Sequence, residues 1–475
     1  MKIKLLFGLL LLANMVMAQN HTLPRHQVTE WSNYTLEEMQ GDIVIPVVFI
    51  NFSSNNNDNE VSITETNQTE WLRRLNDTCS SNHMGDNGSV NDWFAAQSYG
   101  KTNVVFERVG EYKAAGKAAD YYQKSACATL VCDATTALTD VDWSRYDRNG
   151  DKDVDCVLLI FAGHADGDCT VRGKTVTSIY PFRDWMSNRK PSKHHVGDYT
   201  IDSFVFANNL RHYSQSIDEV NTICHELSHG ILDLTDYYRS LTSYMGQYDS
   251  MCYGFRQLNG KGDHCCEMCS FNKMYMGWLT PTELSQPGHV KMRPLANNAE
   301  ACIIFDNADP NHFFLLENRA KEDDTWDAHL PAGGLVVTEV NFVRNNFEYH
   351  NVNSGPKKNI RIICAATSTG IQIPNDTYYS FDQTQIPYGI NGRSEISSRV
   401  SQVFATKTIT NIIVNADNTI EFDFMGGGND IELGIEKNTV KVVDAMKIYD
   451  IMGRELTSEP CSGMYVKNGM KYLVR

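Results

Sequence analysis

The chain lacks long apolar runs. After Met17, no stretch of its 475 residues reaches about 18 uninterrupted apolar residues, the length at which a helix begins to span a bilayer. Internal repeats with a period of about 20 to 50 residues are also absent, which excludes a solenoid or a repeat array. We therefore expect the processed chain to be a soluble protein of two or three domains.

The chain also lacks an excess of basic residues. It has 42 Lys and Arg against 58 Asp and Glu, so its formal net charge at pH 7 is −16. Because proteins that bind nucleic acid present basic faces to phosphate groups, this balance argues against a nucleic-acid partner. The acidity suits an exported protein that holds divalent cations, and solubility alone explains it equally well.

The first residues predict export. Lys2 and Lys4 precede an apolar run from Leu5 to Met17, and Val16-Met17-Ala18 fits a small-residue cleavage site. We interpret residues 1–18 as a signal peptide and residues 19–40 as an N-terminal segment of a secreted protein. An uncleaved membrane anchor is the alternative.

Cysteine is plentiful, with 13 residues. In an oxidising compartment the default expectation is disulfides, and Cys127 and Cys132 are close enough in sequence to close a small loop. The dense run from His264 to Cys269 is an alternative second metal site, but it holds one CxxC pattern without a partner pair. No motif supports a cysteine nucleophile.

The segment His225-Glu226-Leu227-Ser228-His229 points to metal chemistry. On an α-helix, this spacing puts both histidines on one face, where two imidazoles bind one metal ion. Glu226 then lies beside the metal, in the position of a general base for water.

The residues around this segment predict a helix. Residues 216–219 read as an N-terminal capping box, and Gly230 reads as a helix terminator. Apolar residues recur at helical spacing between them and predict a buried face: Val220, Ile223, Cys224 and Leu227.

A catalytic zinc site takes three protein ligands and one open position. Asp236 follows the histidines closely, and a sharp turn of the chain at Gly230 brings its carboxylate back to the metal. Glu267, in a helix predicted from about Cys265 to Trp278, is the rival third ligand. The run from Tyr248 to Gly254 is similar to a methionine turn beneath the metal.

Residues 222–279 resemble the immune inhibitor A family of secreted zinc metallopeptidases. The resemblance rests on these runs: Thr222-Ile223-Cys224-His225-Glu226, Asp236-Tyr237-Tyr238, Ser250-Met251-Cys252-Tyr253-Gly254 and Met276-Gly277-Trp278-Leu279. Further similar blocks extend it to roughly residues 41–426: Ser89 to Phe94, Gln97 to Gly100, Val157 to His164, Phe314 to Arg319 and Leu330 to Leu335. The chain departs from the family after the second histidine, where Leu232-Asp233-Leu234-Thr235-Asp236 replaces a Gly-Leu-Pro-Asp run.

The resemblance implies a secreted zinc endopeptidase that cleaves protein or peptide substrates. His225, His229 and Asp236 are then the metal ligands, and Glu226 is the catalytic base. Tyr237, Tyr238 and Tyr253 are all candidates for holding the oxyanion. The alternatives are a non-catalytic surface adhesin on a peptidase scaffold, for which Glu226 has no chemical use, and a lectin-like module in the second half.

An acidic loop precedes the strand predicted at residues 154–161, and the family carries a similar loop there. Its oxygen-bearing side chains alternate and predict a calcium site: Asp147, Asn149, Asp151, Asp153 and Asp155. The match to an EF-hand loop is partial, because Lys152 stands at the glycine position and Leu158 at the final glutamate position. A solvated acidic turn is the alternative.

These elements predict an α+β protein with a zincin-type catalytic domain, which combines a mixed sheet with a metal-binding helix. We place this domain at residues 41–285 and a β-rich part at 286–426. Residues 43–52 predict a buried strand, residues 53–69 a loop, and residues 409–424 a hairpin. We expect a monomer.

The glycines at 426–428 read as a linker to a C-terminal β-module at residues 427–475. Strand-like alternation before Gly453 and a turn at Asn468-Gly469 resemble the sorting domain of type IX secretion cargo. This resemblance implies secretion machinery as a partner and a location at the cell surface or beyond. A small β-meander that packs on the body is the alternative.

Overall fold

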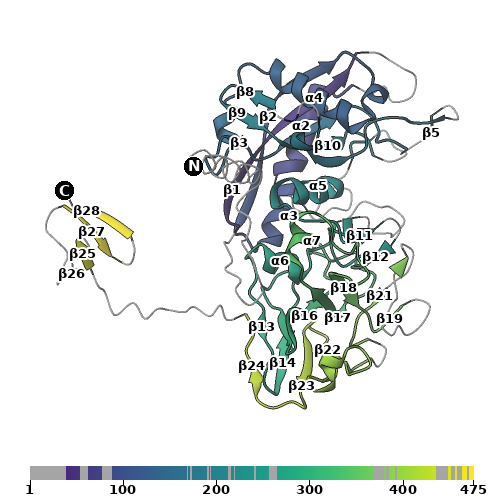
Figure 1. The fold of residues 1–475 in the computed structure, drawn as a ribbon, viewed down its shortest axis with the longest axis vertical. Coiled ribbons are helices and arrows are strands. Elements are labelled where there is room, and N and C mark those ends of the chain that lie inside the picture. The colour runs from purple at the N-terminus through teal and green to yellow at the C-terminus, as the bar shows by residue number, and fades with distance from the viewer. Residues whose placement is uncertain are drawn as a thin grey trace, which may run out of the picture. The chain divides into compact units, whose positions relative to one another are not determined.

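The computed structural model divides into two compact units, residues 1–433 and 434–475 (Figure 1). The signal peptide predicted at residues 1–18 and nearly all of the segment at 19–40 lie outside the described residues. The structure describes residues 39–53, 62–77, 88–167, 170–171, 174–189, 192, 194–211, 216–218, 220–239, 242–255, 265–367, 379–380, 385–390, 393–434, 448–450, 455–456, 463–467 and 470–474.

The first half of the larger unit is built on a mixed sheet. Its strands, in sheet order, are β2 (Thr102–Ala114), β1 (Gly41–Phe52), β4 (Val157–Phe161), β10 (Ser203–Asn208) and β7 (Phe182–Trp185). Four strands are parallel, and β7 runs antiparallel to β10 at the edge. The buried strand predicted at residues 43–52 is confirmed. Pro46 is tolerated because β4 pairs with β1 only from Val47 onward.

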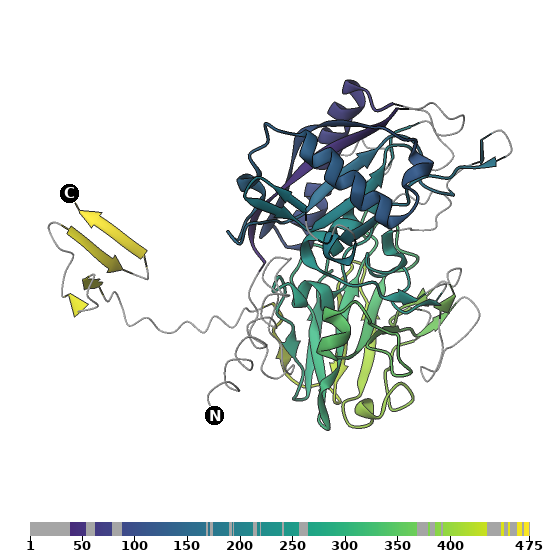
Figure 2. The ribbon, with the colours of Figure 1, turned by 45° about the horizontal axis from the view of Figure 1, so that its top comes forward.

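Helices cover both faces of this sheet, so β1 is apolar on both sides (Figure 2). Val47 and Phe49 pack in one hydrophobic cluster, and Val48 and Ile50 pack in another. The helices are α2 (Glu65–Asn76), α3 (Val90–Gln97), α4 (Lys124–Ala137) and α5 (Asn221–Leu232). The loop predicted at residues 53–69 is therefore wrong from Glu65, where Thr64 starts α2 with a capping box.

The second half is β-rich, as predicted. One sheet has the order β13 (Thr282–Glu283), β15 (Cys302–Asp306), β16 (Asp309–Arg319), β17 (Gly334–Asn341) and β18 (Ile360–Ile363). A second has the order β22 (Ile409–Val414), β23 (Ile420–Phe424), β14 (Gly288–Met292) and β24 (Asp430–Ile431). The hairpin predicted at residues 409–424 is confirmed by the pairing of β22 with β23.

Shorter elements complete the described part of this unit. The helices α6 (Ser270–Tyr275) and α7 (Arg344–Glu348) are brief, so the helix predicted at residues 265–278 is wrong at both ends. The remaining strands are β3 (Asp153–Val154), β5 (Thr170–Val171), β6 (Lys174–Thr175), β8 (His194–Val196), β9 (Tyr199–Ile201), β11 (Tyr238–Arg239), β12 (Thr242–Ser243), β19 (Ala366–Thr367), β20 (Tyr379–Ser380) and β21 (Gln385–Ile386). The architecture is mixed α/β with several sheets and few helices.

The predicted domain boundaries differ from the compact units. One hydrophobic cluster joins Phe49 of β1 and Leu227 of α5 to Leu315 of β16 and Val336 of β17, so residues 41–285 and 286–426 share a core. The chain also does not leave the body at residue 426. It passes the glycines and adds β24 to β14, which extends the larger unit to Leu433.

The smaller unit is an antiparallel sheet in the order β26 (Glu455–Leu456), β25 (Ile448–Asp450), β27 (Gly463–Lys467) and β28 (Met470–Val474). Lys467 pairs with Met470, which is the hairpin register predicted around residues 468–469; the turn itself lies outside the described residues. Across the described part of both units, no helix is long and apolar enough to cross a bilayer.

None of the ten described cysteines forms a disulfide, so the expectation of disulfides is wrong for them. Cys127 and Cys132 lie on the same helix, α4, and close no loop. Cys79, Cys169 and Cys461 lie outside the described residues.

Candidate metal centre

Helix α5 carries the predicted metal ligands and lies against β10 and β7 (Figure 1). Its predicted apolar face is confirmed, because Val220, Ile223, Cys224 and Leu227 are all buried. Both predicted ends are wrong. Val220 occupies the N-cap without a side-chain cap, and the helix runs past Gly230 to Leu232.

Packing explains why a glycine lies inside this helix. A Cβ atom at Gly230 would lie 3.0 Å from Cys156 Sγ and 3.2 Å from Val205 Cγ2, so the small residue lets α5 approach the sheet. The chain instead reverses at Asp233, whose φ of 54° is left-handed. This turn directs the next residues back toward the histidines.

Three side chains converge after the turn. His225 Nε2, His229 Nε2 and Asp236 Oδ1 form a triangle in which each of the three separations is 3.3 Å. Tetrahedral zinc with bonds of about 2.0–2.1 Å separates its ligand atoms by about 3.3–3.4 Å. The triangle therefore has the dimensions of one face of a zinc coordination tetrahedron.

Main-chain carbonyls orient both imidazoles. His225 Nδ1 lies 2.8 Å from the carbonyl oxygen of Ser250, and His229 Nδ1 lies 2.6 Å from that of Leu234. Because each Nδ1 donates to a carbonyl, each neutral ring directs its Nε2 lone pair at the centre of the triangle. Such carbonyl partners are usual for histidines that bind metal.

Asp236 forms the third corner of the triangle, and its side chain is partly exposed to solvent. Asp236 Oδ1 is buried and accepts no hydrogen bond from the described residues, whereas the side chain as a whole is 35% exposed. Burial disfavours the charged form, but the two imidazoles hold the pKa of Asp236 well below its usual range. Burial likewise opposes protonation of His229, but the Asp236 carboxylate raises the pKa of this imidazole. A metal cation bound between the three side chains would stabilise the Asp236 carboxylate as a protonated imidazole does.

Glu226 lies one residue along the helix, outside the triangle. Its Oε2 accepts a hydrogen bond of 2.9 Å from the main-chain N–H of Arg183 in β7. Its charge contributes to raising the pKa of His229, so the carboxylate lies near the metal ligands. Sequence reasoning missed Arg183 and two further neighbours of the site, Asp233 and His350, because they meet only in the folded chain.

The rival ligand, Glu267, lies elsewhere. Its carboxylate forms a buried ion pair of 2.8 Å with Lys273, and both side chains are at most 1% exposed. Among the described His, Cys, Asp and Glu residues, His225, His229 and Asp236 alone bring three ligand atoms within 4.8 Å of one another.

The predicted methionine turn lies beneath His225. Ser250 supplies the carbonyl that orients this imidazole, and buried Met251 accepts a main-chain hydrogen bond from Tyr237. Gly254 is required in the turn, because a Cβ atom there would lie 2.5 Å from the carbonyl oxygen of Asp249.

The structure also separates the tyrosine candidates. Tyr237 is buried, and its hydroxyl donates a hydrogen bond of 2.5 Å to Asn272 Oδ1, so this hydroxyl is already bonded inside the core. Tyr238 is partly exposed, and its ring lies 6.5 Å from that of His225 and 5.3 Å from that of Tyr253. Of the three candidates, Tyr238 is partly exposed, whereas Tyr237 and Tyr253 are buried.

In the acidic loop, side chains bind the loop's own backbone. Asp147 accepts hydrogen bonds from the N–H groups of Gly150, Asp151 and Lys152, and Asp151 accepts one from Asp153. Lys152 has a φ of 72°, the left-handed conformation of the glycine it replaces.

No three carboxylates of this loop converge as closely as the ligand atoms around His225. Burial raises the pKa of Asp155 to about 7. Calcium binding at the loop stays a prediction.

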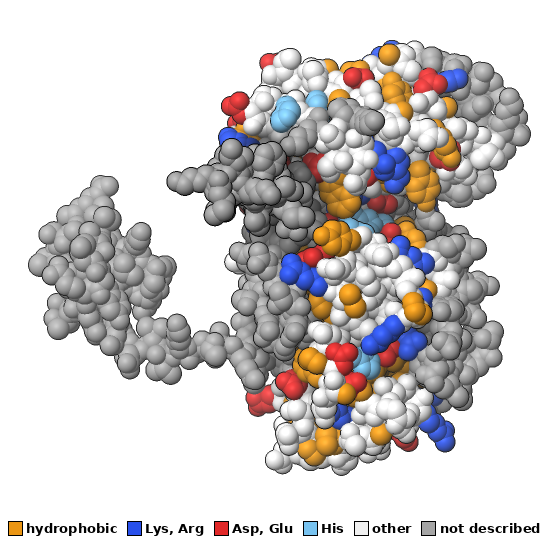
Figure 3. Space-filling model, in the orientation of Figure 1, with side chains coloured by type: hydrophobic (Ala, Val, Ile, Leu, Met, Phe, Trp, Pro, Cys, Tyr) orange, Lys and Arg blue, Asp and Glu red, His pale blue; other side chains and the backbone are white. Residues whose placement is uncertain are grey.

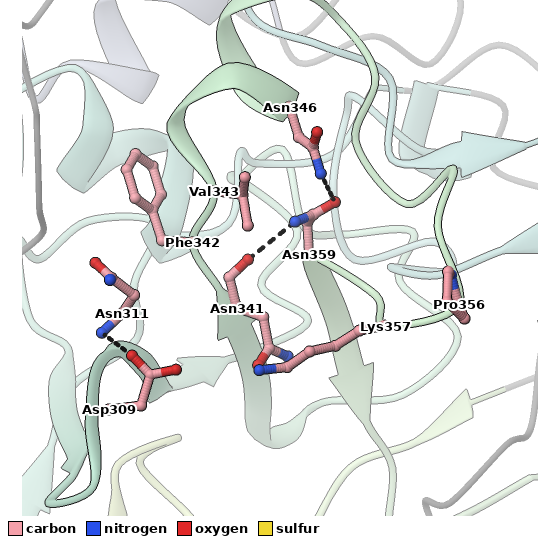
Figure 4. A pocket seen from close by; sticks show the side chains of 9 residues that line it. All are labelled: Asp309, Asn311, Asn341, Phe342, Val343, Asn346, Pro356, Lys357 and Asn359. Carbon is pink, nitrogen blue, oxygen red and sulfur yellow. Dashed lines mark hydrogen bonds between the residues drawn. The ribbon is translucent and has the colours of Figure 1, made fainter.

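A cavity of about 410 Å³ opens in the second half of the unit (Figure 4). Its lining contains none of the metal-centre residues, so it is a separate feature; the lining residues are Asp309, Asn311, Asn341, Phe342, Val343, Asn346, Pro356, Lys357 and Asn359. By contrast, Figure 3 shows histidine atoms at the surface where the two halves of the larger unit meet.

No protein-family model matches this chain, and no curated protein matches it.

Proposed function

We propose that the protein is a secreted zinc-dependent endopeptidase. The observation that carries this proposal is the triangle of two Nε2 atoms and one carboxylate oxygen, each 3.3 Å from the others, with Glu226 beside it. Two imidazoles and a carboxylate form a ligand set that suits zinc and leaves one coordination position open. Zinc, when bound, polarises a carbonyl group and lowers the pKa of a water molecule.

The protein's own residues have separate roles in this proposal. Glu226, oriented by the Arg183 N–H, takes the proton of the attacking water and returns it to the leaving nitrogen. Tyr238 donates a hydrogen bond to the oxygen that gains charge as the carbonyl carbon becomes tetrahedral. Asp236 supplies the negative charge that makes the ligand set selective for a divalent cation.

The sheet supports a zincin-type fold. The resemblance implies a mixed sheet with a metal-binding helix. The described sheet has four parallel strands and an antiparallel edge strand, and α5 packs against this edge. The signal peptide predicted at residues 1–18 and the antiparallel sheet of the C-terminal unit support the proposal of export by secretion machinery.

Casein hydrolysis by the purified full chain tests the proposal. We expect activity that is lost with a chelator and restored by zinc. His229→Ala should lose both bound zinc and activity. His289→Ala is the matched control, because this histidine pairs with Asp423 in the second half and should keep both. Zinc binding without hydrolysis would favour the adhesin.

A further inference from the structure

The carboxylate of Asp233 joins three parts of the larger unit beside the metal centre. Asp233 ends α5, and its Oδ1 lies 3.0 Å from the guanidinium of Arg183 in β7 and 3.0 Å from His350 Nε2. The Asp233 side chain is 9% exposed, so both contacts form away from bulk water.

Arg183 contacts α5 through both its side chain and its main chain. Its guanidinium pairs with Asp233, while its N–H donates to Glu226 Oε2 at 2.9 Å. The arginine side chain is 5% exposed and stacks over the ring of Trp185. A displacement of this residue therefore disturbs both contacts with α5.

β7 is an edge strand of the sheet. It is four residues long, and among the described strands it pairs only with β10. Loss of Asp233 removes a carboxylate partner from this buried guanidinium, which is costly, so it favours movement of the strand toward water. The Arg183 N–H would move with it.

His350 brings the second half of the unit to the same point. Its ring centroid lies 5.3 Å from that of Trp185 and 6.3 Å from that of His229. Arg239 holds this segment through the carbonyl oxygens of His350 and Val352, at 3.1 and 2.8 Å. The left-handed φ of 52° at His350 turns its ring into the site.

We propose that Asp233 is a positioning residue of the peptidase. It acts through Arg183 to hold the N–H that orients Glu226, and through His350 to hold residues 350–352 against the metal helix. This inference rests on the proposed function. Because Asp233 is not a ligand in the triangle, its loss should change turnover and leave metal content unchanged.

The test compares Asp233→Asn and Asp233→Ala with the wild type in the zinc-loaded full chain. We expect a fall in kcat of about 10- to 100-fold, since a misplacement of about 1 Å at a reacting group costs about 100-fold. Zinc content should stay at the wild-type level, and KM should change less than kcat. An unchanged kcat in Asp233→Ala would overturn the proposal.

Asp184→Ala is the matched control. Asp184 lies in the same strand and is buried, and its carboxylate pairs with Arg189 instead of with Asp233 or His350. This variant should lose stability and keep kcat. An equal fall in kcat in both variants would mean that any disturbance of β7 has the same effect, which would overturn a specific role for Asp233.

A double-mutant cycle separates positioning from general loss of stability. In the Glu226→Gln background, Asp233→Ala should reduce the residual activity by less than twofold, because the base it positions is already gone. A further fall as large as that in the wild-type background would show that Asp233 does not act through Glu226.

Amide hydrogen exchange tests the link without any activity. The Arg183 amide should exchange faster in Asp233→Ala, and also in Glu226→Ala, than in the wild type. Unchanged exchange in Asp233→Ala would refute the link even if the protein is a peptidase. Failure of the wild type to cleave casein, with faster exchange in the variant, would refute the proposed function and leave the link standing.

Discussion

Replacing Glu226 by Gln removes one charge and keeps the geometry of the site. In the structure, Glu226 Oε2 accepts the Arg183 N–H at 2.9 Å, and the carbonyl oxygen of a glutamine can accept the same bond. The ligand triangle excludes Glu226, so zinc binding should be retained. The variant lacks the basic carboxylate that, in the proposed mechanism, takes a proton from water.

The expected loss can be given a magnitude. General-base catalysis contributes about 10²- to 10⁴-fold. At about 1.4 kcal/mol for each factor of ten, the barrier should rise by about 3 to 5 kcal/mol. Casein hydrolysis should therefore fall by at least about 100-fold.

The assay measures zinc content, melting temperature and initial rate on the same preparation. Glu226→Asp, which keeps the charge on a shorter side chain, is the companion variant and should retain more activity than Glu226→Gln. Full activity of zinc-loaded Glu226→Gln would refute the assignment of the base.

Three further predictions concern stability. Burial opposes the charged form of His312, but Glu339 and Asp306 raise the pKa of this imidazole. Its contribution to the free energy of unfolding should be complete below about pH 6.5 and be lost as the pH rises through the higher folded pKa. Urea unfolding of His312→Gln should show no such loss of stability with pH, and a pH profile identical to that of the wild type would contradict the ion pair. Gly230→Ala should lower the free energy of unfolding by about 1–3 kcal/mol, because overpacking against the sheet outweighs the gain in helix propensity. A melting temperature above that of the wild type would contradict this, since it would mean that the sheet residues move to make room for the methyl group. Millimolar calcium should raise the melting temperature of the zinc-loaded wild type and not that of Asp151→Ala. The gain in the free energy of unfolding is about 2.7 kcal/mol when calcium is at about 100 times its Kd. An unchanged melting temperature in the wild type would mean that the loop is a solvated acidic turn.

The sequence predicted the parts of the site that depend on local spacing. His225, Glu226 and His229 belong to one helix, so their relation follows from helical geometry alone. The apolar face of α5 was predicted for the same reason, and the strand β1 was predicted from its continuous apolar run. Asp236 was predicted from its closeness to the histidines and a turn at Gly230, and the resemblance implied the same ligand. The turn lies instead at Asp233, which no local rule shows.

The errors arose where tertiary contacts decide. The prediction that Gly230 ends the metal helix is wrong. Gly230 lies inside the helix, where its small size allows the close approach to Cys156 and Val205. Arg183 and His350 meet Asp233 across 50 and 117 residues of sequence. No periodicity or spacing reports contacts of that range.

The hydrophobic cluster beneath α5 has a consequence for cooperativity. Its members include Phe49 in β1, Leu227 in the metal helix, Leu315 in β16 and Val336 in β17. Elements joined by one core melt together, so the larger unit should unfold in a single transition, and a fragment that ends at residue 285 should not fold by itself. The half that holds the candidate metal centre thus depends for its stability on strands that carry none of the proposed ligands.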